Sequence, residues 1–307
     1  MSLGVLNNLN AIYATNNLNN TNNSLSGVLQ QLSSGSRINS GADDAAGLSL
    51  VNGLSANASA LTQSANNATQ GVGLLKVADG ALSQVTNLLN RAVTLATEAS
   101  NGTLNSSQLT AANQEYQSIL AEVNNIGTTT TYNQTQVFGQ GSAATVSIYT
   151  GDSSSNGSSI DNLSFAQLSS SSVGDAGGSV SLTAATASSA ATITYSAAAS
   201  NASVDLTSAD ISTTTGAQTT LNLLNQAIAS VAAQQGYIGS QINTLNSVSQ
   251  VISTQQQNIA AAQNAIQATD YATATSNLAK YEILSQTGIS ALAQANSLQQ
   301  QVTKLLQ

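Results

Sequence analysis

The sequence predicts a mainly α-helical, elongated protein. Long antiparallel helices would form a coiled-coil-like bundle with paired terminal helices and a small β-rich insert at one end. Three observations support this prediction. Two long segments carry apolar residues at a seven-residue spacing, and both chain ends carry shorter heptads. The middle of the chain instead has short runs bearing Thr, Val and Tyr, separated by Gly, Ser, Asp and Asn.

The longest heptad segment spans residues 218–269. Its principal line is Leu224, Val231, Ile238, Leu245, Ile252, Ile259 and Ile266, and the predicted companion line is Leu221, Ile228, Gln235, Ile242, Ser249, Gln256 and Gln263. At about 1.5 Å per residue this helix would be roughly 75 Å long. No charged side chain occurs in residues 211–269, so we expect neighbours on several sides of the helix. The polar companions Gln235, Ser249, Gln256 and Gln263 are candidates for setting its register.

The N-terminal half predicts three helices. Residues 1–33 carry Leu18, Leu25 and Leu32 at heptad spacing, and residues 34–47 interrupt this pattern with three glycines. A second long run carries Leu54, Leu61, Ala68, Leu75, Leu82, Leu89 and Ala96, and Asn101-Gly102 is a helix-stop signal. Ser106 or Ser107 would cap a third helix that continues to Gly127.

The remaining chain predicts strands and then another helix. Residues 134–138, 145–150, 179–183 and 191–195 are expected to be strands, within or beside a low-complexity insert at 169–204. The final segment has the heptads Tyr281, Leu284, Gly288, Ala291, Ala295, Leu298, Val302 and Leu305. Its small residues would allow close helix approach.

Composition argues against several functions. Charged residues make up 6%, against about 25% in ordinary globular proteins, and the net charge of −8 with only five basic residues disfavours nucleic acid and anionic membranes. The chain contains no Cys and no His, so we expect no enzyme, cofactor or imidazole or thiolate metal site. No segment is apolar enough for membrane insertion, and the N-terminus lacks the pattern of a secretory signal, which by itself predicts a cytoplasmic protein.

The two chain ends resemble bacterial flagellin. The segment LSSGSRINSGADDAAGLSL at 32–50 is similar to the family's N-terminal motif at nearly every position. The segment ATDYATATSNLAKYEILSQTGISALAQANSLQQQVTKLLQ at 268–307 is similar to its C-terminal end, and ISTTTGAQTTLNLLNQAI at 211–228 is similar to the re-entry into its C-terminal core. The resemblance covers roughly residues 1–150 and 205–307.

This resemblance implies a filament subunit that is exported unfolded by the flagellar type III system and located outside the cell, in the flagellum. Residues 1–42 and 265–307 would form the inner tube of the filament and be disordered in the monomer. Residues 43–168 and 205–264 would form the rod, and 169–204 an exposed variable insert. Implied partners are further copies of the chain, an export chaperone on the C-terminal segment, and the filament cap and junction proteins.

The resemblance also points to individual residues. Arg37, Asn39, Asp43 and Asp44 belong to the N-terminal motif; Asp43 and Asp44 could be an acid pair, but charge complementarity at a helix N-terminus or a contact with Arg37 is the favoured interpretation. The segment 88–103 is similar to the part recognised by the animal Toll-like receptor for flagellin. There Arg91, Leu95 and Glu115 match, whereas Val93 and Thr94 depart from the pattern and leave receptor activation open.

Two other functions remain as alternatives. A hook–filament junction protein shares similar termini, but it often has Pro in the motif where this chain has Asp44-Ala45-Ala46-Gly47. A secreted hydrolase or adhesin would need a cluster of catalytic groups or a larger insert. Gly71-Val72-Gly73 is a weak match to a phosphate-binding loop, since no strand precedes it.

Overall fold

The computed structural model of the chain describes residues 8–139, 144–152, 160–165, 168–169, 172–173, 179–182, 191–194 and 204–305. These residues belong to two compact units. Unit 1 comprises residues 1–55 and 258–307, and unit 2 comprises residues 56–257. Residues 1–7 of the predicted first helix and most of the 169–204 insert lie outside the described residues.

Helices dominate the described part of the chain, which confirms the predicted mainly α class with long paired helices. They are α1 (Leu9–Ser34), α2 (Ala45–Ser100), α3 (Ser106–Thr129), α4 (Thr214–Gln267) and α5 (Tyr271–Leu305). Each begins or ends within a few residues of a break that the sequence marks with Gly, Asn, Ser or Asp. The Asn101-Gly102 stop is one example, because α2 ends at Ser100 and Gly102 has a φ of 69°.

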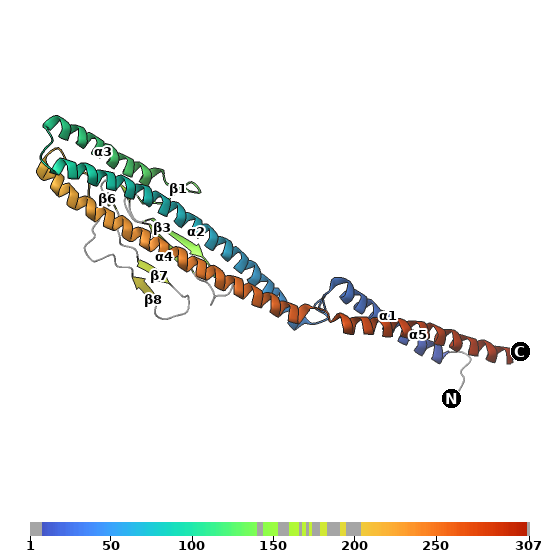
Figure 1. Cartoon of the computed structure of the whole chain (residues 1–307). Coiled ribbons are helices and arrows are strands. Elements are labelled where there is room, and N and C mark those ends of the chain that lie inside the picture. The colour runs from blue at the N-terminus through green and yellow to red at the C-terminus, as the bar shows by residue number, and fades with distance from the viewer. Residues whose placement is uncertain are drawn as a thin grey trace. The chain divides into compact units, whose positions relative to one another are not determined.

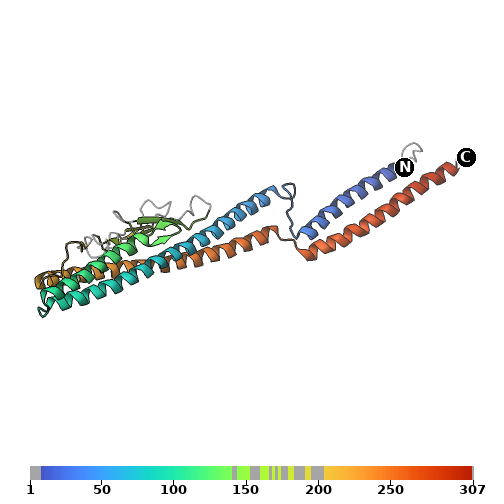
Figure 2. The ribbon, with the colours of Figure 1, turned by 90° about the horizontal axis from the view of Figure 1, so that it is seen from above.

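Unit 2 is built on the pairing of α2 with α4, which lie side by side in both views, while α3 returns along α2 (Figures 1 and 2). The predicted heptad line of α2 faces this core. Leu61, Ala68, Leu75, Leu82, Leu89 and Ala96 are each at most 2% exposed. Farther along the pair, Gln256 Nε2 donates a hydrogen bond of 3.1 Å to Thr62 Oγ1.

The start of α3 corrects one sequence prediction. The N-cap is Asn105, whereas the sequence suggested Ser106 or Ser107. Asn105 Oδ1 accepts from the Gln108 amide at 2.9 Å, and Gln108 Oε1 accepts from the Asn105 amide at 2.9 Å. This reciprocal capping box satisfies two backbone donors, which a serine one residue later could not do in the same geometry.

The strands between α3 and α4 form four antiparallel hairpins in the described residues. They are β1 (Thr131–Tyr132) with β2 (Thr135–Gln136), β3 (Ala144–Tyr149) with β4 (Ile160–Phe165), β5 (Leu168–Ser169) with β6 (Ser172–Val173), and β7 (Ser179–Leu182) with β8 (Ala191–Thr194). Strand β4 was not predicted. Its first two residues reverse the usual alternation of buried apolar and exposed polar side chains. Ile160 is exposed, while Asp161 is buried on the same face as Leu163 and Phe165.

The β3–β4 hairpin packs on α4 of unit 2. The Ser164 amide donates to Tyr237 Oη at 3.2 Å, and Gln234 Nε2 donates to the Ser164 carbonyl at 3.4 Å. These bonds satisfy both backbone groups of a strand residue with side chains of a helix. The hairpin therefore covers a face of α4 that does not contact α2.

Candidate assembly surface

Helices α1 and α5 run antiparallel to each other in unit 1 (Figures 1 and 2). Few of their described side chains are buried. Among the described side chains, Val28 is the only buried residue of α1 and Ala274 the only one of α5. The predicted heptad residues Leu18, Leu25 and Leu32 are half-buried. On α5 the less exposed positions include several small residues, namely Ala274, Ser285, Gly288 and Ala295. The pair is therefore joined by a narrow contact of small and medium-sized side chains.

Two leucines of the predicted α5 line are exposed. Leu284 is 43% exposed and Leu298 is 47% exposed. The small residues of the same predicted line, Gly288 and Ala295, are less exposed than these leucines. Val302 and Leu305 fall in α5, but their side chains lie outside the described residues.

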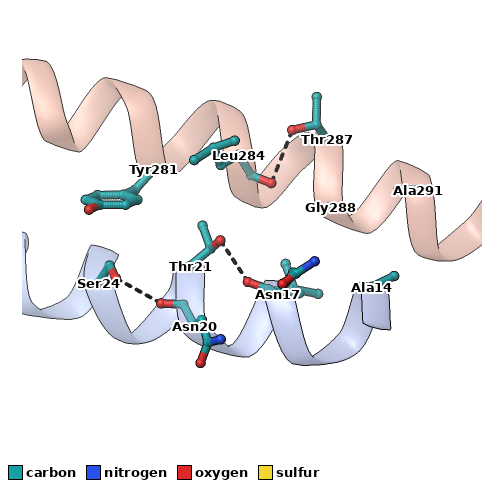
Figure 3. Close-up of a pocket in the computed structure, with 11 residues that line it drawn as sticks. Ala14, Asn17, Asn20, Thr21, Ser24, Tyr281, Leu284, Thr287, Gly288 and Ala291 are labelled. Atoms are coloured by element: carbon teal, nitrogen blue, oxygen red, sulfur yellow. Dashed lines mark hydrogen bonds between the residues drawn. The ribbon is translucent and has the colours of Figure 1, made fainter. Parts of the chain in front are cut away.

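A shallow groove of about 560 Å³ runs between α1 and α5 (Figure 3). Its lining is uncharged and combines small residues with a few larger ones: Ala14, Asn17, Leu18, Asn20, Thr21, Ser24, Tyr281, Leu284, Thr287, Gly288 and Ala291. A Cβ placed on Gly288 would lie 3.2 Å from Leu18 Cδ1, so the leucine already packs against the glycine backbone. Glycine thus permits the close approach of the two helices at this level.

The outer faces of the same two helices expose many large apolar side chains. Ile283 is 64% exposed and Ile289 is 57% exposed, and the set also contains Leu9, Ile12, Tyr13, Leu29, Tyr271 and Leu298. Large contiguous exposed apolar patches are unusual on monomeric proteins and often mark association surfaces. The sequence prediction missed Tyr13, Ile283 and Ile289 because it searched for one heptad line. The signal that could have identified these residues was the presence of apolar side chains outside the heptad line on helices with few charged residues.

The long seam of α4 is buried where it was predicted within unit 2. Leu224, Val231, Ile238, Leu245 and Ile252 are each at most 2% exposed, whereas Ile259 and Ile266, in unit 1, are half-buried. The more buried second line is Thr220, Ala227, Gln234 and Gln241, one residue before the predicted companions. The β3–β4 hairpin explains the difference, because it covers this side of α4 and contacts Gln234.

The N-terminal motif residues lie in the connection between α1 and α2. Asp43 accepts bonds from the Asn39 and Ser40 amides, and these bonds lower the pKa of its carboxyl. Asp44 accepts a bond of 2.8 Å from the Gly47 amide at the start of α2. Arg37 Nη2 instead donates to the Ile266 carbonyl at 2.8 Å. Each aspartate stabilises a turn or helix start, and the described ion pairs include none with Arg37.

Arg91 on α2 and Glu115 on α3 form an ion pair of 2.7 Å between half-exposed side chains. Leu95 is only 3% exposed and packs in the core of unit 2. The three predicted receptor-contact residues are therefore near one another in the fold, but the surface there presents the ion pair and not the leucine side chain. An exposed pair of this kind contributes little to stability, at most about 1 kcal/mol.

Gly71 and Gly73 have packing roles. A Cβ on Gly71 would lie 3.1 Å from Leu245 Cδ1 and 3.3 Å from Ile148 Cγ1, and one on Gly73 would lie 3.4 Å from Tyr132 Oη. Both glycines lie within α2, with no strand before them. Among the described residues there is also no metal-holding cluster of Asp and Glu, and no helix there has the length and hydropathy for crossing a bilayer.

Two family descriptions match most of the chain. Residues 5–143 match the bacterial flagellin N-terminal helical region, and residues 221–306 match the bacterial flagellin C-terminal helical region. The flagellin of Listeria monocytogenes is 28% identical over 292 residues, covering 94% of each protein. Flagellin 1 of Proteus mirabilis is 36% identical over 143 residues, covering 46% of this chain and 39% of that one. The crystal structure of Bacillus cereus flagellin aligns with 64% of this chain and 94% of its own, at 23% identity and a TM-score of 0.44.

Proposed function

The chain belongs to the bacterial flagellin family and is a structural, non-enzymatic subunit of the extracellular flagellar filament, and we propose that it polymerises through the apolar faces of α1 and α5. One observation carries this proposal. The terminal helices expose many of their large apolar residues, and among the described side chains they bury only Val28 and Ala274. A second copy of the chain can cover those residues, and a heterologous contact repeated in this way gives an open helical polymer.

The terminal helices are proposed to become ordered only on assembly. Ordering the backbone costs about 1–2 kcal/mol per residue, whereas burial of one Leu or Ile gains about 1.5–3 kcal/mol. α1 contains 26 residues and α5 contains 35, yet each has a single fully buried side chain among those described. Contacts with neighbouring subunits would supply the missing burial. On this view residues 1–42 and 265–307 of many subunits form the inner tube of the filament, residues 43–168 and 205–264 form the rod in a surrounding tube, and residues 169–204 face outwards.

Specific partners follow from the family and are proposals for this chain. Export as an unfolded chain through the flagellar type III system fits a sequence without cysteine and with 6% charged residues. The exposed apolar residues of α5 are a suitable target for an export chaperone before assembly. Cap and junction proteins would contact the same termini at the filament ends.

Recognition by a host Toll-like receptor would use the face that carries Arg91 and Glu115. Both side chains are about half-exposed, so they are accessible in a free subunit. Leu95 would support this face from the core and would not contact a receptor directly. The hook–filament junction alternative is not favoured, because a flagellin matches 94% of the chain.

The assembly proposal is tested with Ile283→Thr/Ile289→Thr, which removes exposed apolar surface without adding charge. The matched control is Gln286→Thr/Ser290→Thr, which lies on the same helix and removes no large apolar side chain. We expect the critical concentration for polymerisation to rise about ten- to a hundredfold for the isoleucine pair, because loss of about 1.4 kcal/mol changes an equilibrium tenfold. Sedimentation of filaments across a concentration series measures it. An unchanged critical concentration for the isoleucine pair would contradict the proposal, as would an equal rise in the control.

A further inference from the structure

The two connections of unit 1 are joined by a small polar structure that we call the connector clasp, formed by residues 35–38 and 266–269. An isolated antiparallel bridge pairs Ser36 with Ala268. The Arg37 amide donates to the Gln267 carbonyl at 2.7 Å, and the Thr269 amide donates to the Gly35 carbonyl at 3.1 Å. The clasp therefore ties the end of α1 to the start of α5 through backbone bonds.

Arg37 adds the one charged group of the clasp. Its guanidinium donates to the Ile266 carbonyl, in the last turn of α4, at 2.8 Å. The last carbonyls of a helix lack intrahelical donors and carry partial negative charge, so a cation there is favourable. Gln31 Nε2 donates to the Arg37 carbonyl at 3.2 Å, and Thr269 Oγ1 donates to the Gln31 carbonyl at 3.3 Å. Arg37 thus connects the last turns of both α1 and α4.

The contact between α1 and α5 has few features that could fix its own register. α1 contains no charged residue, and the described ion pairs include none between these two helices. The facing side chains combine half-buried leucines with small and polar residues, so a shift by one helical turn would exchange one set of neighbours for another. Interlocking side chains and ion pairs normally specify helix register. The packing of Leu18 on Gly288 is an interlocking contact of this kind, and the described part of the contact contains no ion pair.

The two helices nevertheless keep the same alignment along the length of their contact. Ser36 pairs with Ala268 at the clasp, and at the far end Asn8 Nδ2 donates to the Ala295 carbonyl at 3.0 Å. The chain thus advances by 28 residues along α1 and by 27 along α5 between these two contacts. Between them, Ser285 Oγ donates to Asn22 Oδ1 at 3.2 Å. The alignment present at the clasp is therefore maintained to the end of the pair.

We infer that Arg37 is a positioning residue that sets the register of α1 against α5 through the connector clasp. The register decides which apolar residues of the two helices come together on the outer face. This inference rests on the proposed role of that face in polymerisation, since the clasp itself contacts no partner. In the correct register Leu18 lies over Gly288, and a slip by one turn would place a bulkier residue opposite it.

A disulfide reports the register directly, because the chain contains no native cysteine. A Cβ at position 288 lies 3.8 Å from Leu18 Cβ, which is within the range of about 3.5–4.5 Å found in disulfides. The double variant Leu18→Cys/Gly288→Cys therefore reports the native register. Leu18→Cys/Leu292→Cys, with the second cysteine one turn farther along α5, reports a slipped one.

Both cysteine pairs are combined with Arg37→Ala, Arg37→Lys or the control Lys280→Gln, which also removes one positive charge from unit 1. Each chain is added as a minor component to wild-type flagellin during polymerisation, so a chain that cannot nucleate filaments still enters them. After mild oxidation, mass spectrometry of the filaments measures the native and slipped disulfides. Arg37→Ala should lower the native-to-slipped ratio about fivefold, as expected for loss of one solvent-exposed hydrogen bond. Arg37→Lys should restore most of the ratio, and Lys280→Gln should leave it unchanged.

An unchanged ratio in Arg37→Ala would overturn the inference, and so would an equal fall in Lys280→Gln. Failure of the assembly proposal is read separately, from the critical concentration of Ile283→Thr/Ile289→Thr. The register is measured only in chains that have entered a filament, so the two experiments can fail independently.

Discussion

Replacing Gly127 with alanine adds one methyl group to α3 where the backbone of β5 lies against it. A Cβ at this position would lie 2.9 Å from the carbonyl carbon of Leu168 and 3.3 Å from its Cβ, and would overlap its carbonyl oxygen. Leu168 is fully buried in the core of unit 2, so its backbone cannot move into solvent. Either α3 or β5 must shift.

Two opposing effects determine whether Gly127→Ala raises or lowers the free energy of unfolding. Alanine is a better helix former than glycine by about 1 kcal/mol, and forcing an extra methyl group into a packed core costs about 1–3 kcal/mol. The cost should exceed the gain here because the clash is with backbone. We therefore expect Gly127→Ala to lower the free energy of unfolding by about 1–2 kcal/mol. Gly80→Ala in α2 meets no atom within 4 Å and should raise it by about 1 kcal/mol.

Urea unfolding of the full-length monomer, followed by circular dichroism, measures both changes. The two variants make the same chemical change in helices of the same unit, so the sign of the effect separates packing from helix propensity. If Gly127→Ala were as stable as the wild type or more stable, the close packing of α3 on β5 would be refuted.

Three further predictions concern buried polar groups in unit 2. Tyr116 Oη has no hydrogen-bond partner among the described residues, so Tyr116→Phe should leave the free energy of unfolding at neutral pH unchanged or slightly higher. Tyr237→Phe removes the acceptor of the Ser164 amide, so it should lower the free energy of unfolding, measured in urea, by about 1 kcal/mol. Burial, with a smaller contribution from Asp210, raises the pKa of Tyr116 above its ordinary 10, so the stability of the protein should fall as the pH rises above 10. Tyr116→Phe should weaken this fall in thermal scans. An unaltered fall in the variant would contradict this prediction. Burial also raises the pKa of Asp161 above 3.8, so its contribution is fully present below pH 3.8 and is lost as pH rises through the folded value. Asp161→Asn should remove this dependence and not destabilise the protein at pH 7, and a large loss there would show that the carboxylate is needed.

The sequence predicted the helices well because their periodicity extends over many turns. The heptad line of α2 and the principal line of α4 each repeat at least six times, and such long repeats tolerate a few exceptions. The companion line of α4 was displaced by one residue, because the β3–β4 hairpin covers a sector of the helix that no local pattern reveals. Strand β4 was missed because it directs Asp161 inwards and Ile160 outwards.

The candidate assembly surface was predicted only in part. Heptad counting found the half-buried Leu18 and Leu25 and the small residues Gly288 and Ala295, but not the exposed Ile283 and Ile289. A single heptad line describes one face of a helix, so it gives no information on apolar residues of the other faces. The connector clasp was also invisible, because its bonds run between backbone groups that are distant in sequence.

The central claim is that α1 and α5 become stable through contacts between subunits. Amide hydrogen exchange, measured by mass spectrometry on dilute monomer and on assembled filaments, tests it most directly. We expect α1 and α5 to exchange rapidly in the monomer and slowly in filaments, while the core turns of α2 and α4 around Leu82 and Val231 are protected in both. Strong protection of both terminal helices in the dilute monomer would contradict the account.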